Sequence, residues 1–369
     1  MKVARLSVVV LLVVFSALAG IAAAQDAPPQ PAYYLAADDG GVQQIYQLIL
    51  DGESEPRQIS HSESGVINFE VAYDGLGVAY YGDGQLWLQS VHTEEPEAVA
   101  PVSAVQFFSG PVWSQDGQYL AYADNGVWLI DLSTRETQQL LADIPIDESA
   151  SNAAEFRIYQ PELFVLGEDG TAAKLIVDVG IWEWNTVGVY DLASGELQEL
   201  EGQVHTDLLP LSDGRALLYG NTGMGGEFVP HIADSLDAIN TYTEAVGDVD
   251  TMNIPLFTEQ AVEIAPGVVR IFGSTIPTTP EETNAFSFDF DTTTGEAGEV
   301  NLVTLSQGET GATVAGTLSP NGRTVPVYHN AQWTEAGSIY GGFNLLDLAT
   351  GEALPIEFPE IVSIFRWQP

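Results

Sequence analysis

The sequence predicts an all-β fold, namely a single β-propeller built from four-stranded antiparallel blades. Three observations predict it: a strand that ends in a tight turn recurs along the chain, the two chain ends complement each other, and long helical periodicity is absent. Four antiparallel strands per repeat of about 40 to 55 residues are typical of propeller blades. We therefore expect residues 32–369 to form one ring-shaped domain.

The first strand of each repeat is apolar and runs into a glycine turn, as in Phe69–Gly75 and Pro111–Gly117. Asp-Gly and Asn-Gly pairs supply the positive φ that tight hairpin turns require. Further copies of the turn end at Gly170, Gly214, Gly267 and Gly322, so that successive glycines are 42, 53, 44, 53 and 55 residues apart.

The number of first strands predicts seven blades. A partial copy at the C-terminus, Phe365–Pro369, completes that count. Six blades remain the alternative, because the copy at Val262 is degenerate and residues 221–258 do not divide cleanly into strands.

The remaining strands of each repeat follow the turn. Tyr119–Ala123 is a second strand, and Val127–Asp131 is a third strand that ends at an aspartate. Asp191 and Asp347 recur at the position of Asp131, which favours a role in capping backbone N–H groups of the hairpin. One helix is expected at His231–Ile239, because its apolar residues are spaced i, i+4 and i+7.

The two chain ends predict how the ring closes. Residues 362–367 form only a first strand, whereas the N-terminal part supplies three further strands at Tyr33–Ala37, Gln44–Asp51 and Pro56–Ile59. A blade assembled from both ends leaves no unpaired edge between the first and last blades.

These repeats resemble those of TolB-like propellers, which carry a WD-like unit. The resemblance rests on Trp113–Gly117 with the strands after it, on Leu318–Gly322 and on Phe365–Pro369, and it extends over residues 32–369. It implies the propeller fold but no particular function, since such propellers serve many roles. The sequence differs from the known families in two ways. TolB carries an additional domain before its propeller, and propeller-bearing serine peptidases carry a hydrolase domain. We expect neither domain here, because the strand repeats occupy residues 32–369.

The N-terminal segment predicts export. Lys2 and Arg5 precede an apolar run, and small residues with an Ala-x-Ala pattern end at Ala24, which is typical of a secretory signal peptide over residues 1–24. An uncleaved membrane anchor is the alternative. Residues 25–31 read as a short linker. We expect a periplasmic, cell-surface or extracellular protein with no membrane span in the mature chain.

The charge excludes some partners. The chain has 10 Lys+Arg against 52 Asp+Glu, a net charge of -42. Removing Lys2 and Arg5 leaves 8 against 52, or -44. Such a field repels nucleic-acid phosphates and anionic lipid headgroups. The absence of Cys excludes disulfides and thiolate chemistry.

No local catalytic or metal motif is present. The sequence contains no Gly-x-Ser-x-Gly, no His-Glu-x-x-His and no histidine pair at zinc spacing. We therefore predict no cofactor. Calcium is the metal that the sequence could bind, because carboxylates that can serve as its oxygen ligands lie close together in two places. These are Asp248 and Asp250, and Asp289, Asp291 and Glu296.

Aromatic residues divide into packing and binding candidates. Trp113 and Trp367 occupy equivalent repeat positions, so we expect them to pack between blades. Binding candidates lie outside the repeat pattern, where stacking on a sugar or a partner's apolar side chain is the expected role. They are Trp182, Trp184 and Trp333, with Phe228, His231 and Tyr242 in the irregular segment 221–256.

Two functions follow from these observations. The first is an exported, non-catalytic propeller that binds a protein or polysaccharide partner on one face of the ring. The alternative is a carbohydrate-active hydrolase or lyase that uses carboxylates or histidine in the central channel. The residues on or beside first strands that such an enzyme would use are Glu70, Glu162, His205, Asp207 and Glu263.

Overall fold

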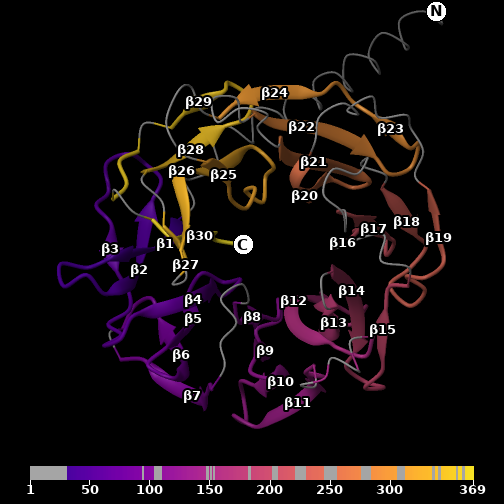
Figure 1. The fold of residues 1–369 in the computed structure, drawn as a ribbon, viewed down its shortest axis with the longest axis horizontal. Helices are drawn as coiled ribbons and strands as arrows, with labels where there is room; N and C mark the ends of the chain where they lie inside the picture. The colour runs from indigo at the N-terminus through magenta and orange to yellow at the C-terminus, as the bar shows by residue number, and fades with distance from the viewer. Residues whose placement is uncertain are drawn as a thin grey trace, which may run out of the picture.

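The computed structural model shows a ring of seven β-sheets around a central axis (Figure 1). Among the described residues it contains strands and turns and no helix. The structure describes residues 31–369 except 94, 104–109, 147–148, 150–151, 153, 182–183, 202–206, 221–229, 245–255, 276–283, 306–311, 335–336, 340–341, 355 and 360–361.

Each sheet is one blade, and its strands are listed here from the axis outward. Blade 1 is β4 (Val66–Val71), β5 (Gly77–Gly82), β6 (Gln85–Ser90) and β7 (Glu97–Pro101). Blade 2 is β8 (Val112–Trp113), β9 (Tyr119–Ala123), β10 (Gly126–Asp131) and β11 (Thr137–Ala142). Blade 3 is β12 (Ile158–Leu166), β13 (Ala172–Ile181), β14 (Trp184–Asp191) and β15 (Leu197–Glu199). Blade 4 is β16 (Asp207–Pro210), β17 (Ala216–Tyr219), β18 (His231–Ala233) and β19 (Tyr242–Glu244).

The remaining blades carry additional or borrowed strands. Blade 5 is β20 (Leu256–Ala265), β21 (Val268–Thr275), β22 (Asn284–Asp291) and β23 (Glu296–Ala297), with β24 (Asn301–Thr304) also paired to β22. Blade 6 is β25 (Ala312–Ala315), β26 (Thr324–Thr334), β28 (Gly342–Asp347) and β29 (Glu352–Ala353), with β27 (Gly337–Ile339) paired to β26. Blade 7 is β30 (Ile364–Trp367), β1 (Pro31–Ala37), β2 (Gln43–Ile49) and β3 (Arg57–Gln58). The prediction of seven blades is therefore confirmed.

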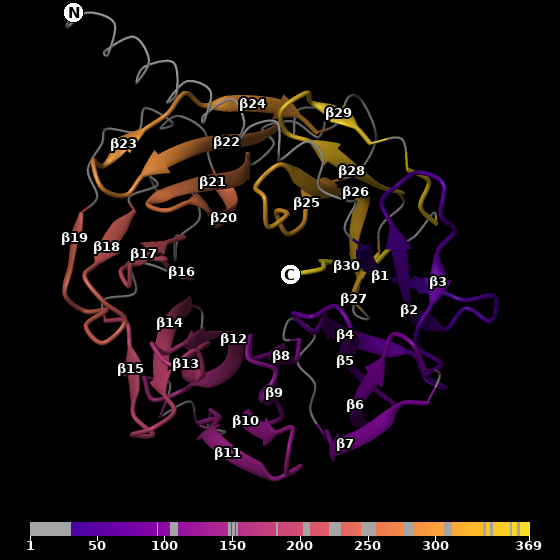
Figure 2. The same ribbon diagram turned by 180° about the vertical axis from the view of Figure 1, so that it is seen from behind.

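Closure by the two chain ends is also confirmed. The last strand, β30, pairs antiparallel with β1, with Ala32 opposite Trp367 and Leu35 opposite Ile364. Seen from either side, the C-terminal residue lies inside the ring, close to the axis (Figures 1 and 2). The final strand therefore forms part of the channel wall.

Turn chemistry follows the predicted repeat. The six repeat glycines that end first-strand turns all adopt positive φ, from +67° at Gly322 to +90° at Gly214. At the other hairpins, Asp131 accepts hydrogen bonds from the backbone N–H groups of Ser133 and Thr134 at 2.8 and 3.0 Å. Asp191, Asp291 and Asp347 cap their turns in the same way. The recurring aspartates are structural caps, as the repeat predicted.

The hydrophobic core lies between neighbouring blades. Each apolar cluster joins two adjacent sheets, as where Tyr33 of blade 7 packs with Phe69 of blade 1. Trp113 and Trp367 belong to this packing, and each indole N–H donates to a backbone oxygen of a neighbouring blade, at Glu70 and Thr317 respectively. The packing role predicted for the two tryptophans is confirmed.

The helix expected at His231–Ile239 is wrong. Residues His231–Ala233 form strand β18, and the following residues form turns. Ile232 packs between blades 4 and 5, whereas Leu236 and Ile239 pack between blades 3 and 4. The helical spacing of the three apolar residues arises from a strand followed by turns, and pairing with β17 and β19 outweighs local propensity.

Candidate functional site

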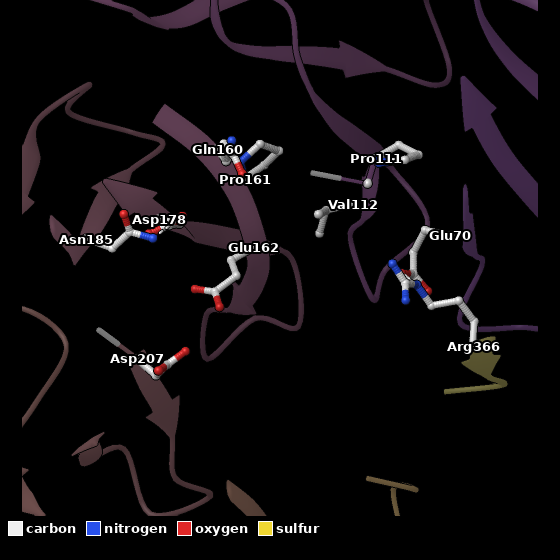
Figure 3. A pocket seen from close by; sticks show the side chains of 11 residues that line it. Glu70, Pro111, Val112, Gln160, Pro161, Glu162, Asp178, Asn185, Asp207 and Arg366 are labelled. Carbon is white, nitrogen blue, oxygen red and sulfur yellow. Dashed lines mark hydrogen bonds and ion pairs between the residues drawn. The ribbon is translucent and has the colours of Figure 1, made fainter. Parts of the chain in front are cut away.

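A polar cavity of about 450 Å³ lies at the ring axis. Its wall comes from the inner parts of blades 1, 2, 3, 4 and 7 (Figure 3). The residues that line it are Glu70, Gly110, Pro111, Val112, Gln160, Pro161, Glu162, Asp178, Asn185, Asp207 and Arg366. Five of these eleven residues are ionisable, namely Glu70, Glu162, Asp178, Asp207 and Arg366.

One wall of the cavity is acidic. Glu162 on β12, Asp178 on β13 and Asp207 at the start of β16 face the same space, and Figure 3 shows the carboxylates of Glu162 and Asp207 extending toward each other. We call these three residues the acidic wall. They come from two adjacent blades, so the arrangement depends on how blades 3 and 4 pack.

A bulge in β12 places Glu162 in the cavity. Pro161 pairs with Val177 and Leu163 pairs with Ile176, so Glu162 has no opposite residue on β13. Bulges re-aim side chains, and Pro161 has no N–H to donate to a regular ladder. The Pro-Glu pair thus turns a carboxylate toward the axis.

The pKa values of two residues of the acidic wall, Glu162 and Asp178, are raised. Burial, then the negative charges of Asp207 and Asp178, raises the pKa of Glu162 to about 8. Burial and the charge of Asp207 raise the pKa of Asp178 to about 6, against a hydrogen bond from the Val179 backbone N–H. The Glu162 side chain is exposed to solvent in the cavity, so water screens part of this effect.

The opposite wall carries a neutralised carboxylate. The Arg366 guanidinium donates from Nε to Glu70 Oε2 at 3.0 Å and from Nη2 to Asn68 Oδ1 at 3.3 Å. Its Cζ atom lies 6.0 Å from the centroid of the Phe69 ring, within cation–π range. Burial raises the pKa of Glu70, and the charge of Arg366 opposes that rise.

The other basic side chains are engaged elsewhere. Of the eight Lys and Arg residues after residue 24, seven form ion pairs with carboxylates in the described structure. The eighth, Arg57, donates to Gln47 Oε1 at 2.6 Å. Among the described lining residues, Arg366 is the one cation, and it is bound to Glu70.

The structure brings together three of the five residues predicted for a catalytic channel. Glu70, Glu162 and Asp207 all line the cavity. Glu263 does not, because its carboxylate accepts hydrogen bonds from the backbone N–H groups of Ser212 and Gly267. His205 lies outside the described residues.

Sequence reasoning missed two cavity residues. Asp178 lies on a second strand, where alternation with apolar Val177 and Val179 marks it as a residue that faces away from the core. Arg366 lies on the closing strand, whose role as a first strand indicates that it borders the axis. Both signals are readable from the sequence once each strand's place in its blade is known.

Of the six predicted aromatic binding residues, the two whose side chains are described, His231 and Tyr242, do not line the axial cavity. His231 and Tyr242 lie together in the outer half of blade 4, with ring centroids 4.9 Å apart in an edge-to-face contact. Trp184 lies in β14 and Trp333 in β26, but their side chains, like all of Trp182 and Phe228, lie outside the described residues. A binding role for these aromatics remains a prediction.

The calcium candidates have structural partners where they are described. Asp289 receives two hydrogen bonds from Arg270, at 2.7 and 2.9 Å, and Asp291 caps its turn. Asp248 and Asp250 lie outside the described residues. Within the described part of the chain, no group of three or more His, Asp or Glu side chains is arranged to hold a metal ion. That part also contains no helix with the length and apolarity needed to cross a membrane.

Solved structures with the same fold are numerous, although no protein-family model and no characterised sequence matches this chain. A prolyl endopeptidase is 12% identical, with 92% of this chain and 49% of that one covered and a TM-score of 0.56. An oligogalacturonate lyase in complex with manganese is 11% identical, with 87% and 82% covered and a TM-score of 0.53. TolB from Acinetobacter baumannii is 16% identical, with 76% and 65% covered and a TM-score of 0.44.

The endopeptidase and lyase structures support the predicted propeller fold. At such identities the likeness shows the fold alone. The chain spans less than two thirds of the TolB chain and about half of the endopeptidase. Because a lyase and an endopeptidase share the fold, the likeness selects no single function.

Proposed function

We propose that this protein is an exported, non-catalytic propeller that binds a basic protein or polymer partner, with the axial cavity as its recognition pocket. The observation that supports the proposal is the acidic wall, because the three carboxylates of Glu162, Asp178 and Asp207 line one cavity at the axis. Carboxylates held together repel one another, and a bound cation relieves that repulsion.

The rest of the molecule supports a basic partner. With 8 Lys+Arg against 52 Asp+Glu after residue 24, and with seven of the eight cations in ion pairs, the surface field is negative. Such a field accelerates encounter with a positively charged partner and repels an acidic one. The negative surface attracts a basic partner in general, and the axial cavity supplies the specific binding site.

The test distinguishes binding at the axial cavity from electrostatic attraction by the whole negative surface. Fluorescence anisotropy is measured with labelled poly-lysine, poly-arginine and poly-glutamate on the wild-type protein and on a Glu162→Gln, Asp207→Asn double variant. The proposal predicts binding of the basic probes and a loss of at least about tenfold in affinity in the double variant, as for groups that desolvate on binding. The Glu168→Gln variant is the control, because Glu168 is an exposed carboxylate in the turn after β12. Equal loss in control and double variant contradicts the proposal.

Acid–base chemistry on a glycan is the second candidate function. Glu162 has a pKa raised to about 8 and lies beside the Asp207 carboxylate, and glycosidases use such a pair with one carboxylic acid protonated. A neutral glycan suits the cavity better than an acidic one, because of the field. Turnover of a neutral-glycan panel by the wild type, abolished in Glu162→Gln, would favour this function over binding.

Export is part of the proposal. It is supported by the signal-peptide pattern over residues 1–24. Fractionation of expressing cells, with N-terminal sequencing of the exported product, tests it. The proposal predicts a mature protein that begins at Gln25; a cytoplasmic, uncleaved product contradicts it.

A further inference from the structure

We infer that a second cavity, between blades 5 and 6, binds a neutral ligand that carries several hydroxyl groups on one ring, a sugar or a cyclic polyol. The cavity has a volume of about 220 Å³ and shares no lining residue with the axial cavity. Blades 5 and 6 lie side by side in the ring (Figures 1 and 2). The site goes beyond the proposed function, because it does not depend on the acidic wall. Its polar lining residues are Arg270, Ser287, Asp289, Glu299, Asn301 and Arg323.

A break in the outer strand of blade 5 shapes this cavity. β22 pairs with β24 over its first half and with β23 over its last two residues, so residues 298–300 between the two outer strands leave the ladder. The Gly298 backbone N–H donates to the Asp289 carbonyl oxygen at 2.7 Å, which holds the break in place. Among the described strands, no other third strand pairs with two outer strands. The segment at the break forms one wall of the cavity, through Gly298 and Glu299.

The side chain of Ser287 is the feature that points to a ligand. It is 7% exposed, and no described residue forms a hydrogen bond with its hydroxyl group. Side chains alternate along β22: Phe286 and Phe288 pack between blades 4 and 5, whereas Ala285 packs against blade 6, so Ser287 faces blade 6 as well. A buried polar group without a partner costs about 1–3 kcal/mol. A ligand hydroxyl in the cavity supplies the missing partner.

The neighbouring polar groups offer both donors and acceptors. Arg323 donates to Asp347 from Nε and Nη2, at 3.0 and 2.7 Å, and its Nη1 donates to no described residue. Its side chain is 47% exposed. The Asn301 amide donates from Nδ2 to the Leu348 carbonyl oxygen at 2.7 Å, which leaves its Oδ1 atom as an acceptor. Glu299 is exposed and adds a carboxylate to the same lining.

The charges of the cavity favour a neutral ligand. Arg270 donates two hydrogen bonds to Asp289, at 2.7 and 2.9 Å, and Arg323 is bound to Asp347, so a carboxylate already matches each guanidinium. An anion would approach through the field of a chain with 52 Asp+Glu against 10 Lys+Arg, and a cation would meet the two guanidinium groups. A hydroxyl group both donates and accepts, so it can bond to either kind of group without breaking an ion pair.

The size and the apolar lining fit one ring. A volume of about 220 Å³ lies below the roughly 300 Å³ at which cavities for drug-sized ligands begin. Phe288 and Leu348 contribute the apolar part of the lining, against which the C–H groups of a ring can pack. Mostly apolar walls with a few polar groups that fix orientation are typical of small-molecule sites.

The test is saturation-transfer difference NMR of the full chain. The neutral probes are methyl glucoside, methyl galactoside and myo-inositol, and the charged probes are glucuronate and glucosamine. At least one neutral probe is expected to bind, with a dissociation constant that Ser287→Ala raises at least about threefold, as for the loss of one hydrogen bond. Ser235→Ala is the matched control, because Ser235 follows β18 in blade 4 and does not line the cavity, and it should leave the dissociation constant unchanged.

Folding is checked separately from binding. Since the Ser287 hydroxyl has no partner among the described residues, Ser287→Ala should leave the urea midpoint unchanged or raise it while binding weakens. A lower midpoint would show that the hydroxyl is bonded within the protein and would overturn the inference.

The remaining outcomes are distinguishable. The inference is overturned if no neutral probe binds, if Ser287→Ala leaves the dissociation constant unchanged, or if a charged probe binds more tightly than the neutral ones and responds to Ser287→Ala. The Glu162→Gln, Asp207→Asn double variant should bind the neutral probe as the wild type does. Loss of binding in that variant would place the probe in the axial cavity and overturn the inference, whereas the binding of basic probes tests the proposed function independently.

Discussion

Replacing Glu162 by Gln is expected to stabilise the protein at high pH and to change little at low pH. The folded-state pKa of Glu162 is raised from 4.5 to about 8, so the folded state holds this proton more tightly than the unfolded chain. The contribution of Glu162 to the free energy of unfolding is therefore fully present below about pH 4.5 and is lost as the pH rises toward 8. Glutamine mimics the protonated acid and removes this loss.

The magnitude follows from the same shift. One pKa unit corresponds to about 1.4 kcal/mol, so the shift from 4.5 to about 8 sets an upper limit of about 5 kcal/mol. Water in the cavity reaches Glu162 and screens its charge, which reduces the expected gain at pH 9 to about 1–2 kcal/mol. At pH 5 the variant and the wild type should agree within about 0.5 kcal/mol.

Urea unfolding followed by tryptophan fluorescence at pH 5 and pH 9 measures this difference. Glu168→Gln is again the matched control, since the same chemical change in an exposed turn should shift neither midpoint. If Glu162→Gln is no more stable than wild type at pH 9, or if its effect is equal at both pH values, the reasoning about the acidic wall is refuted.

Other contacts give three further predictions. The Tyr34 hydroxyl is buried without a hydrogen-bond partner among the described residues. Tyr34→Phe should therefore leave the free energy of unfolding unchanged or raise it by up to about 1 kcal/mol, as measured by urea unfolding. A clear loss of stability would show that the hydroxyl has a partner. Arg366→Gln removes the ion pair between blades 7 and 1, and hydrogen exchange of β1 and β30 should rise while that of blades 3 and 4 does not; uniform exchange changes would contradict a local seam. Hydrogen bonds from the Ser194 backbone N–H and from Lys174 lower the pKa of Asp191 to about 2, so Asp191→Asn should cost stability at pH 7 and lose its effect as the pH falls toward 2; an effect that persists in acid would exclude the charge as its cause.

The fold was predictable from the sequence because local and global signals agree. The turns after first strands require positive φ, which Gly75 and Gly322 supply. The hairpins after third strands are marked by capping aspartates such as Asp291. The ring closure was predictable because the C-terminal end has only a first strand and the N-terminal end has only the other three strands of a blade. The segment around His231 was misread, since three apolar residues that serve two different inter-blade clusters happen to have helical spacing.

The site was predictable only in part. Glu70, Glu162 and Asp207 could be named because first strands border the axis, but their convergence depends on the angular order of the blades. The sequence does not reveal that Glu162 occupies a bulge, or that Arg366 neutralises Glu70 and leaves the other wall acidic. These features arise from pairing register and from contacts between residues about 300 positions apart, as for Glu70 and Arg366.

The most direct test of the account is the titration of the Glu162 side chain, followed by carbon-13 NMR of glutamate-labelled protein and assigned with Glu162→Gln. The account predicts a midpoint raised above 4.5 in the free protein and a lower midpoint when a basic peptide is bound, because the bound cation favours the ionised carboxylate. A midpoint near 4.5 that does not move on addition of the peptide would contradict the central claim that the axial cavity is an anionic site awaiting a cationic partner.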